Sequence, residues 1–563
     1  MRKKVIAILL SVTMTAALLA GCGNSGSTSE PAPEQTEDAA QTEGTDEGTD
    51  EAPAEGDSAA AEGTETAESE VGGGGEIKPG GTLKVGTVQS PSVVGFTPEI
   101  TNNSFIQYLR CAYESLLYYD EAGNIVGQLA SEWEADADTA TLTFKLVDGV
   151  NFADGTPFNA EAVKWNIEKY IETGRSETNN IDSVEVVDDS TVNIKLKEWN
   201  SSSLEMIGFF IYYMSPTTFD EKGIEWMRAN SCGTGPFVVN SFDQGVSIKY
   251  TKNENYHVAG QPYLDGIDYT IFGDSTTLTN ALKAGEVDVL TYGNDCDVMK
   301  DLEGIANIVT DKNGNGLGVE SVGIIPSSAD ESDPFYDAKV RQALCYAVDW
   351  DQIVTALSYG YYERTNQWAA PGAVTYNTDL KGYSYDPEKA KALLAEAGYA
   401  DGFDTVIYAG NAGFQNNAAT AISASLAEVG INASVEIIDG AKGNDMMANG
   451  WSGLYWHYAS IGPDLGLYMG RHLDVNGAYY AKGIQHPQDC LDLLGEIRVA
   501  KDEKTKIDLE WQLQEKIYDE YALFGIPLYV NAPVHMRYDY VEGADLAKVH
   551  ATTWSPATTW LNK

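Results

Sequence analysis

Basic residues are scarce in this sequence. Its 36 lysines and arginines stand against 84 aspartates and glutamates, so the formal net charge of the 563 residues is −48 at pH 7. Nucleic acids and anionic membrane surfaces attract basic proteins, and an excess of acidic residues repels both. The composition therefore argues against both as partners, and we expect no nucleic acid to bind. The ligand stays open, because a pocket can differ in charge from the surface around it.

Cysteine is also rare, and its spacing excludes the common zinc and redox motifs. No two cysteines form a Cys-x-x-Cys pair. Apart from Cys22, which belongs to the N-terminal segment, an odd number remains, so at least one thiol is free or pairs between molecules. The sequence predicts no particular disulfide among Cys111, Cys232, Cys296, Cys345 and Cys490.

Several catalytic motifs are absent. The sequence contains no Gly-x-Ser-x-Gly nucleophile, no His-Glu-x-x-His zinc motif and no Walker lysine. His457, His472 and His486 fall in one region but lack the spacing of metal ligands on a helix, so packed or exposed histidines are the better interpretation. We expect a protein that is not an enzyme and that needs no cofactor or metal. A carboxylate pair of the glycosidase kind stays open, because acidic residues are abundant.

The first 22 residues have the pattern of a lipoprotein signal peptide. Three basic residues precede an uncharged apolar stretch over 5–20, which is short for a membrane span of roughly 20 residues and typical of a secretory signal. Its ending, Leu19-Ala20-Gly21-Cys22, resembles the bacterial lipobox, which implies that Cys22 becomes the lipidated N-terminus. An ordinary secretory signal with a chance cysteine is the alternative.

Residues 23–79 are predicted to be a disordered acidic tether. They consist almost entirely of Glu, Asp, Thr, Ser, Ala, Gly and Pro, and so cannot form a core. Like charges along such a segment repel one another and extend it. A lipid at Cys22 and this tether would hold the rest of the chain at the outer face of the cytoplasmic membrane.

From residue 80 onward, strand and helix patterns alternate, which predicts mixed sheets covered by helices. Apolar residues alternate over Thr141–Leu146, as in a strand. Asn159 is a suitable N-cap for a helix that follows it, and Asp386-Pro387 begins another helix that ends at Gly398. A globular part of this length is too long for one core and suggests two or three domains.

Motifs spread over nearly all of the globular part resemble one family. They occur in the family's order, behind a lipobox, and most consist of turn-forming or packing residues rather than ligand-binding ones. The matching segments are 113–117, 128–134, 144–163, 233–237, 253–256, 260–265, 284–288, 340–344, 346–349 and 385–394. The family that they resemble is that of the large extracellular solute-binding proteins of bacterial ABC importers, family 5, which includes oligopeptide, dipeptide and nickel binders.

The resemblance implies an α/β fold of the class II periplasmic-binding-protein kind. Two lobes are joined by two chain crossings, an extra domain is inserted in the first lobe, and the lobes close on a ligand by hinge motion. The implied domains are a signal peptide at 1–22, a tether at 23–79, lobe I at 80–117, 232–320 and 535–563, an inserted subdomain at 118–231, and lobe II at 321–534.

Aromatic and amide residues outside regular patterns are candidates for the ligand site. The resemblance points to the segment 451–464, where peptide-binding relatives have an acidic residue for the peptide ammonium. Ala459 or Ser460 stands at that position here, and Asp464 is the acidic residue that remains. For the aromatic residues, packing in the core is the alternative. The candidate residues are Trp368, Asn411, Phe414, Gln415, Trp456, His457, Tyr458, Ser460 and Asp464.

The resemblance implies a monomeric binding protein that captures a solute and delivers it to the transmembrane subunits of an ABC permease. An oligopeptide held mainly through its backbone is the expected ligand. An oligosaccharide or a metal chelate stays open as the ligand. A surface hydrolase and a sensor or adhesin on the same fold are the other functions that stay open.

Overall fold

The computed structural model describes most of the chain from residue 76 onward. The signal peptide with Cys22 and the tether up to residue 75 lie outside the described residues, so those predictions stay untested. Over the part that is described, no helix has both the length and the apolarity of a membrane span. The described residues are 76–563 without 102–104, 120–123, 292–295, 306, 313–319, 370, 372, 411–412, 461–463, 476, 478–479, 532–533 and 544–555.

Two helices begin at the caps that the sequence predicts. The Asn159 side chain accepts a hydrogen bond of 3.0 Å from the backbone N–H of the third helical residue of α2 (Ala160–Glu172). Asp386 caps α10 (Pro387–Glu396) in the same way, at 2.9 Å. Gly398 follows the end of α10 with φ of +90°, a left-handed conformation that glycine adopts without strain. These helix predictions are confirmed.

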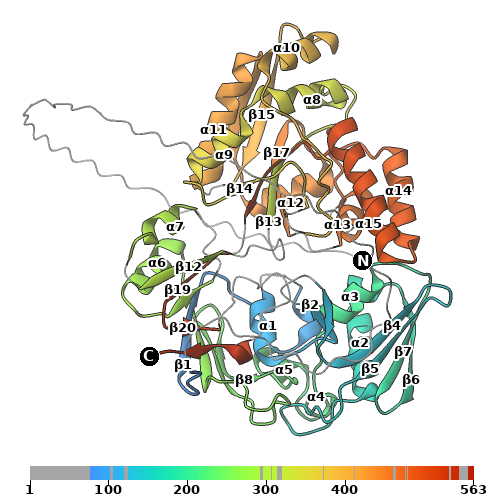
Figure 1. The fold of residues 1–563 in the computed structure, drawn as a ribbon, viewed down its shortest axis with the longest axis vertical. Coiled ribbons are helices and arrows are strands. Elements are labelled where there is room, and N and C mark those ends of the chain that lie inside the picture. Colours follow the sequence, from blue (N-terminus) through green and yellow to red (C-terminus); the bar gives the residue numbers. More distant parts are fainter. Residues whose placement is uncertain are drawn as a thin grey trace, which may run out of the picture. The chain divides into compact units, whose positions relative to one another are not determined.

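A seven-stranded sheet is built from three separate stretches of the chain (Figure 1). Its strand order is β12-β19-β11-β1-β10-β9-β8. One face packs on α1 (Ile106–Ala112) and α5 (Ile224–Ala229), and the other on α6 (Ser275–Lys283) and α7 (Cys296–Leu302). Its strands are β1 (Thr82–Thr87), β8 (Phe237–Asp243), β9 (Ser247–Lys252), β10 (Gly266–Ile271), β11 (Val289–Leu290), β12 (Ile308–Lys312) and β19 (Val534–Tyr538).

A four-stranded antiparallel sheet is formed by residues 130–196, which lie between β1 and β8 in the sequence. The predicted strand over Thr141–Leu146 is β5, and its Leu142, Phe144 and Leu146 are buried on one face against α2. α3 (Ser203–Phe210) and α4 (Pro216–Lys222) follow. The strand order is β4-β5-β7-β6, with β4 (Ala130–Asp136), β6 (Ile181–Asp188) and β7 (Thr191–Leu196), beside a hairpin of β2 (Leu117–Tyr119) and β3 (Ile125–Gly127).

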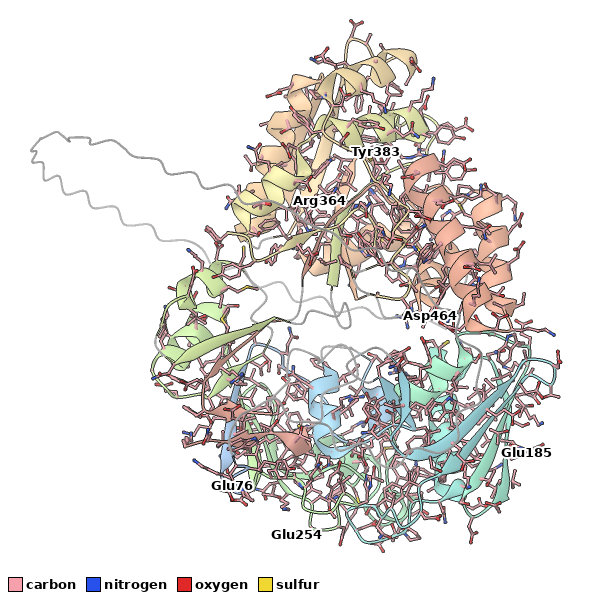
Figure 2. The ribbon with its side chains drawn as sticks, in the orientation of Figure 1. Glu76, Glu185, Glu254, Arg364, Tyr383 and Asp464 are labelled. Carbon is pink, nitrogen blue, oxygen red and sulfur yellow. The ribbon has the colours of Figure 1, made fainter. Side chains whose placement is uncertain are left out.

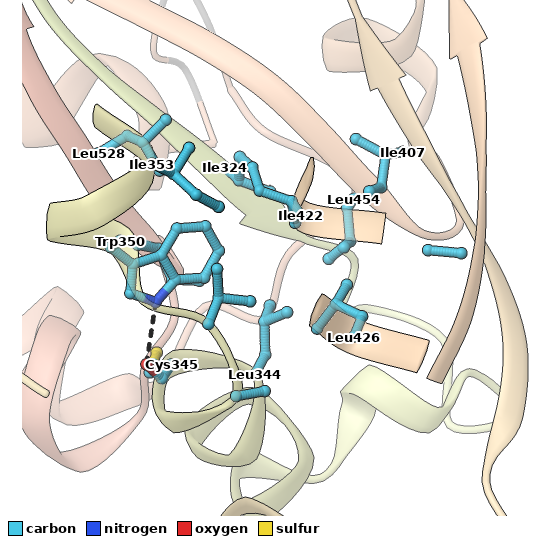
Figure 3. Packing of buried hydrophobic residues seen from close by; sticks show 14 of the residues in the cluster. Ile324, Leu344, Cys345, Trp350, Ile353, Ile407, Ile422, Leu426, Leu454 and Leu528 are labelled. Carbon is cyan, nitrogen blue, oxygen red and sulfur yellow. Dashed lines mark hydrogen bonds between the residues drawn. The ribbon is translucent and has the colours of Figure 1, made fainter. Parts of the chain in front are cut away.

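A six-stranded sheet is covered on both faces. One face packs on α8 (Ala338–Ala347), α9 (Trp350–Leu357), α10 and α11 (Gly413–Glu428), and Figure 3 shows part of that core. There the Trp350 indole donates to the Cys345 carbonyl at 3.0 Å. The strand order is β14-β18-β13-β17-β15-β16, with β13 (Glu320–Pro326), β14 (Glu363–Arg364), β15 (Phe403–Ala409), β16 (Ile431–Ile437), β17 (Leu454–Ser460) and β18 (Ile526–Asn531).

The opposite face of this sheet packs on four helices near the end of the chain. They are α12 (Gly440–Asn449), α13 (Leu465–Leu473), α14 (Gln488–Val499) and α15 (Glu503–Gln514), and α14 and α15 lie side by side in Figure 1. α15 continues as a π-helical turn over Glu515–Glu520. A short pair, β20 (Val541–Glu542) and β21 (Trp560–Leu561), completes the described strands.

The chain passes between the seven-stranded and six-stranded sheets where β12 leads into β13 and where β18 leads into β19. The predicted boundaries of the lobes and of the inserted subdomain stay a prediction. The five cysteines Cys111, Cys232, Cys296, Cys345 and Cys490 are buried free thiols. Burial raises the pKa of the thiols of Cys111, Cys232, Cys345 and Cys490, that of Cys345 to about 12, and so keeps them in the unreactive protonated form.

Candidate functional site

Two of the predicted segments meet at one edge of the six-stranded sheet. β15 and β17 pair in parallel, with Ile407 opposite Leu454 and Tyr408 opposite Tyr455. β15 ends one residue later, level with Trp456, whereas β17 continues to Ser460. Ligands of open α/β sheets bind beyond the carboxyl ends of such strands. The topology therefore places the loop after β15 beside the last part of β17.

The last part of β17 is paired along one side. Its residues up to Ser460 pair with β13, where Trp456 lies opposite Ile324 and Ser460 lies opposite Glu320. On the other side, the described pairing with β15 stops at Tyr455. Beyond Tyr455, the described pairing of β17 is therefore with β13, and this part of the strand extends past the end of β15.

Trp456 and Phe414 come together on one face of the sheet. The Trp456 side chain is 3% exposed, and its ring lies 6.3 Å from that of Phe414. Phe414 lies 5.0 Å from both Tyr362 and Tyr529, which stack on each other at 4.4 Å. We call these four residues the four-ring group. The four-ring group belongs to the hydrophobic core of this face, so most of the surface of its rings is covered by other side chains.

The Trp456 indole N–H has no hydrogen-bond acceptor among the described residues. Buried donors of this kind are nearly always paired in folded proteins. A ligand carbonyl would satisfy it, and Trp456 lies level with the end of β15, one residue beyond the described pairing of β17 with β15. The four-ring group therefore combines apolar surface with one buried donor.

His457 points to the opposite face, because side chains alternate along a strand. Its ring lies 5.8 Å from that of Trp368, which is fully buried, and its Nε2 lies 3.2 Å from Nε2 of His472. His472 Nδ1 lies 3.1 Å from the Tyr468 carbonyl and must donate to it, so its Nε2 accepts from His457. Thus Trp368 and His457 are together, and the sheet separates them from Trp456 and Phe414.

Both imidazoles are held neutral. Burial, and then the neighbouring His472, lower the pKa of His457 well below its usual value. Burial also lowers the pKa of His472 to about 4. Over the described ranges, no group of three His, Cys, Asp or Glu side chains is placed to hold a metal ion. This arrangement fits packed histidines.

Gly410 and Gly413, which flank the undescribed residues after β15, have no room for a side chain. A side chain at Gly410 would meet the Gln415 amide oxygen at 2.1 Å, and one at Gly413 would meet a carboxylate oxygen of Asp297 at 2.5 Å. Asp297 thus lies at the start of α11, where it also accepts a hydrogen bond of 3.0 Å from the Tyr359 hydroxyl. The half-buried Gln415, in the first turn of α11, therefore has its amide group next to Gly410.

Asp464, labelled in Figure 2, is occupied by the protein itself. It caps α13 by accepting a hydrogen bond of 2.7 Å from the Leu467 N–H, and Lys506 Nζ lies 2.8 Å from its Oδ2. Burial favours the neutral acid, but the charge and hydrogen bond of Lys506 outweigh it and lower the pKa of Asp464. Its oxygens are committed to this pair and to the helix cap.

Three predicted residues lie outside what is described. Asn411 falls in an undescribed part of the loop after β15. Tyr458 and Ser460 have a described backbone in β17, and their side chains lie outside the described part. Sequence reasoning missed Tyr362 and Tyr529, whose rings join the site through tertiary contact. Aromatic content was the signal that could have found them, but many aromatic residues share it.

Comparison with known proteins adds a family match. The model of the bacterial extracellular solute-binding proteins, family 5 (middle part), matches residues 124–471. Heme-binding protein A of Haemophilus influenzae is 30% identical over 350 residues, 57% of this chain and 62% of that protein, so the match covers less than two thirds of its length. Glutathione-binding protein GsiB of Pectobacterium atrosepticum is 31% identical over 361 residues, 61% of this chain and 67% of that protein.

A solved structure supports the architecture. The periplasmic binding protein DppA from Helicobacter pylori, in complex with the peptide STSA, has a TM-score of 0.69 and 23% sequence identity. The match covers 86% of this chain and 99% of that chain. Agreement over this much of both chains shows a shared fold, and the predicted fold class is confirmed.

Proposed function

We propose the function of this protein from its family, since the chain belongs to the bacterial extracellular solute-binding proteins of family 5. It captures a solute outside the cell and delivers it to an ABC permease. The family match over residues 124–471 carries this proposal. The protein acts as a monomer without catalysis, and a lipid on Cys22 anchors it to the outer face of the cytoplasmic membrane. The acidic tether 23–79 gives the binding part reach toward solutes and permease.

We further propose that the solute is an oligopeptide. Extended peptides bind by adding main-chain hydrogen bonds to a strand, and pockets then accept their side chains. The last part of β17 extends past the end of β15, and Trp456 of the four-ring group, with its buried donor, lies on this strand. The Helicobacter protein of the same fold is described with a peptide, whereas the curated relatives are described with heme and glutathione.

The peptide N-terminus contributes little in this proposal. An ammonium removed from water needs a counter-charge. Ala459 and Ser460 cannot supply one, and Asp464 already pairs with Lys506. Recognition through the peptide backbone would then dominate, and acetylated or cyclic peptides would bind about as well as free ones.

Calorimetric titration tests the ligand class. The soluble protein is titrated with the peptide Ser-Thr-Ser-Ala, its N-acetylated form, glutathione, hemin and maltotetraose. We expect the peptide to bind and acetylation to cost less than about 1.4 kcal/mol, against the about 3–5 kcal/mol expected when a buried charge pair loses one partner. Binding of hemin or the sugar without any peptide would contradict the proposed class, and the four-ring group would then serve as a stacking platform.

A conservative variant tests the site. Trp456→Phe keeps an aromatic ring in the core but removes the buried donor, so we expect weaker binding by about 1 kcal/mol in a protein that still folds. Trp451→Phe is the matched control, because the Trp451 indole N–H also lacks a described acceptor but packs in the core on the other face of the sheet. Equal losses in both variants would remove Trp456 from the site.

A further inference from the structure

A second contact region joins two distant parts of the chain. The Trp199 indole donates to the Ala500 carbonyl at 2.8 Å, and the Ser201 hydroxyl donates to the Ile497 carbonyl at 2.8 Å. The Ser201 N–H also donates to the Arg498 carbonyl at 2.8 Å. We call the region formed by residues 199–205 and 497–510, with Asp464, the junction. It connects the segment leading into α3 to α13, α14 and α15.

Charged groups are buried inside the junction. The side chains of Lys506 and Asp464 are 5% and 2% exposed. Glu510 is fully buried, and its Oε1 accepts a hydrogen bond of 2.8 Å from the Gly466 N–H. A side chain at Gly466 would meet Glu510 Oε1 at 3.2 Å and Asp464 Oδ1 at 3.4 Å, so the two carboxylates lie close together.

The second oxygen of Glu510 has no partner. Its Oε2 is buried and makes no hydrogen bond to any described residue. Lys506 places its ammonium on Asp464, not on Glu510. Burying an ionised carboxylate with one oxygen that accepts no hydrogen bond costs much free energy, whereas burying a protonated carboxyl group costs far less. The geometry therefore favours a proton on Glu510.

Glu205 brings a further carboxylate from the other part of the chain. It lies on α3 and accepts a hydrogen bond from the Tyr119 hydroxyl. It interacts electrostatically with Asp464 and Lys506. The Lys506 ammonium therefore attracts carboxyl groups from both parts of the chain that form the junction. The titratable groups around Glu510 are Asp464, Lys506 and Glu205, and Glu205 in turn interacts with Glu503 and Tyr119.

The electrostatics agree with a bound proton. Burial, followed by the charge of Asp464, raises the pKa of Glu510 well above its usual value, although Lys506 opposes this. The same two causes raise the pKa of Glu205 to about 7. When residues 199–205 leave the junction, water reaches these groups and their pKa values fall toward those of exposed glutamates, near 4.3.

We propose that the junction is a proton-binding site that closes when residues 199–205 dock on α13–α15. Docking takes up a proton onto Glu510 and Glu205, so it is strongest at low pH and weakens as the pH rises through the raised pKa values. If the solute is trapped by closure, capture tightens in acid and release is easier in alkali. This last step rests on the proposed function, whereas the docking itself does not.

Distance measurement between two spin labels tests the proposal without any ligand. Labels on Glu134→Cys and Lys504→Cys report docking, because both residues are exposed and the described native cysteines are buried. The full chain carries Cys22→Ser. Between about pH 5.5 and about pH 8.5 we expect the population with long distances to rise about tenfold.

Charge-removing variants identify the group. Glu510→Gln keeps the acceptor for the Gly466 N–H but removes one of the two titrating carboxyl groups, so the rise of long distances with pH should be clearly smaller than in the unsubstituted protein. Glu496→Gln, on the exposed face of α14, is the matched control and should respond as the unsubstituted protein does. If Glu510→Gln does not fold, Glu205→Gln is measured in the same way, because Glu205 is half-buried and shares the junction.

Two results would overturn the proposal. One is a distance distribution in the unsubstituted protein that does not change with pH. The other is a pH response of Glu510→Gln, or of Glu205→Gln in its place, equal to that of Glu496→Gln. A pH-dependent junction in a protein that binds no peptide would leave this inference standing and contradict the proposed ligand instead.

Discussion

At the scale of single residues, a buried ion pair holds an early segment to the middle of the chain. Nε2 of His257 lies 3.0 Å from Oε2 of Glu114, and their side chains are 14% and 3% exposed. Burial favours a neutral imidazole, but the hydrogen bond and charge of Glu114 outweigh it and raise the pKa of His257. The Tyr256 hydroxyl and the Gln128 amide also donate hydrogen bonds to Glu114, and these bonds stabilise the buried carboxylate.

This pair should make stability depend on pH. Because the pKa of His257 is raised by folding, its contribution is complete below about pH 6.5 and disappears as the pH rises through the raised value. We expect His257→Asn to lower the free energy of unfolding by about 3 kcal/mol at pH 6 and to remove most of this pH dependence. Urea titrations at pH 6 and pH 9 measure both effects.

The control for this experiment is His486→Asn. His486 is half-buried and stacks on Tyr480, and its pKa is lowered by burial instead of raised. This variant should leave the decrease in stability between pH 6 and pH 9 in place. A decrease that survives His257→Asn unchanged would show that the Glu114 pair does not cause it.

At the scale of elements, helix caps are local and can be tested one at a time. Asp386 accepts from the Lys389 N–H at 2.9 Å, and its removal leaves that donor at the start of α10 unsatisfied. We expect Asp386→Ala to cost about 0.5–2 kcal/mol. Glu388→Ala, two residues along, removes an exposed ion pair with Lys391 and should cost less than about 1 kcal/mol. Thermal unfolding of both variants compares them, and equal losses would argue against the cap.

Strand β17 shows what element patterns can and cannot predict. Its aromatic residues predicted candidates for the ligand site. Side chains alternate along a strand, so Trp456 and His457 lie on opposite faces of the sheet. Which face carries which partner depends on the helices that cover each side of the sheet. Phe414 reaches Trp456 from α11, and Trp368 reaches His457 from a segment far away in the sequence.

At the scale of the whole molecule, the proposed attachment to the membrane depends on one thiol. If residues 19–22 act as the lipobox that they resemble, Cys22 is the acyl acceptor, so Cys22→Ser should abolish labelling with a fatty acid and move the protein from the membrane fraction into the medium, or block its processing. Metabolic labelling followed by fractionation measures this. The variant Cys111→Ser is the control, because Cys111 is buried and should not affect anchoring. Labelling of Cys22→Ser at the level of the unsubstituted protein would contradict the anchor.

Local patterns in the sequence determined much of this fold. The cap residues Asn159 and Asp386 begin their helices as predicted, since a side chain that satisfies an N–H three residues later needs no distant partner. The motifs shared with the family predicted the class II periplasmic-binding-protein fold, which the comparison with Helicobacter DppA confirms. Turns, caps and packing residues lie in short segments, so they remain readable in a single sequence.

Only the tertiary structure decided which residues meet. It joined Tyr362 and Tyr529 to the predicted Phe414 and Trp456, placed Trp368 on the other face, and paired Asp464 with Lys506. Residue type could not separate these outcomes, because an aromatic ring suits a core and a ligand equally well and a carboxylate suits a helix cap and an ammonium. The difference arises from neighbours brought together by strand register and helix packing over long sequence separations, which local propensity does not encode.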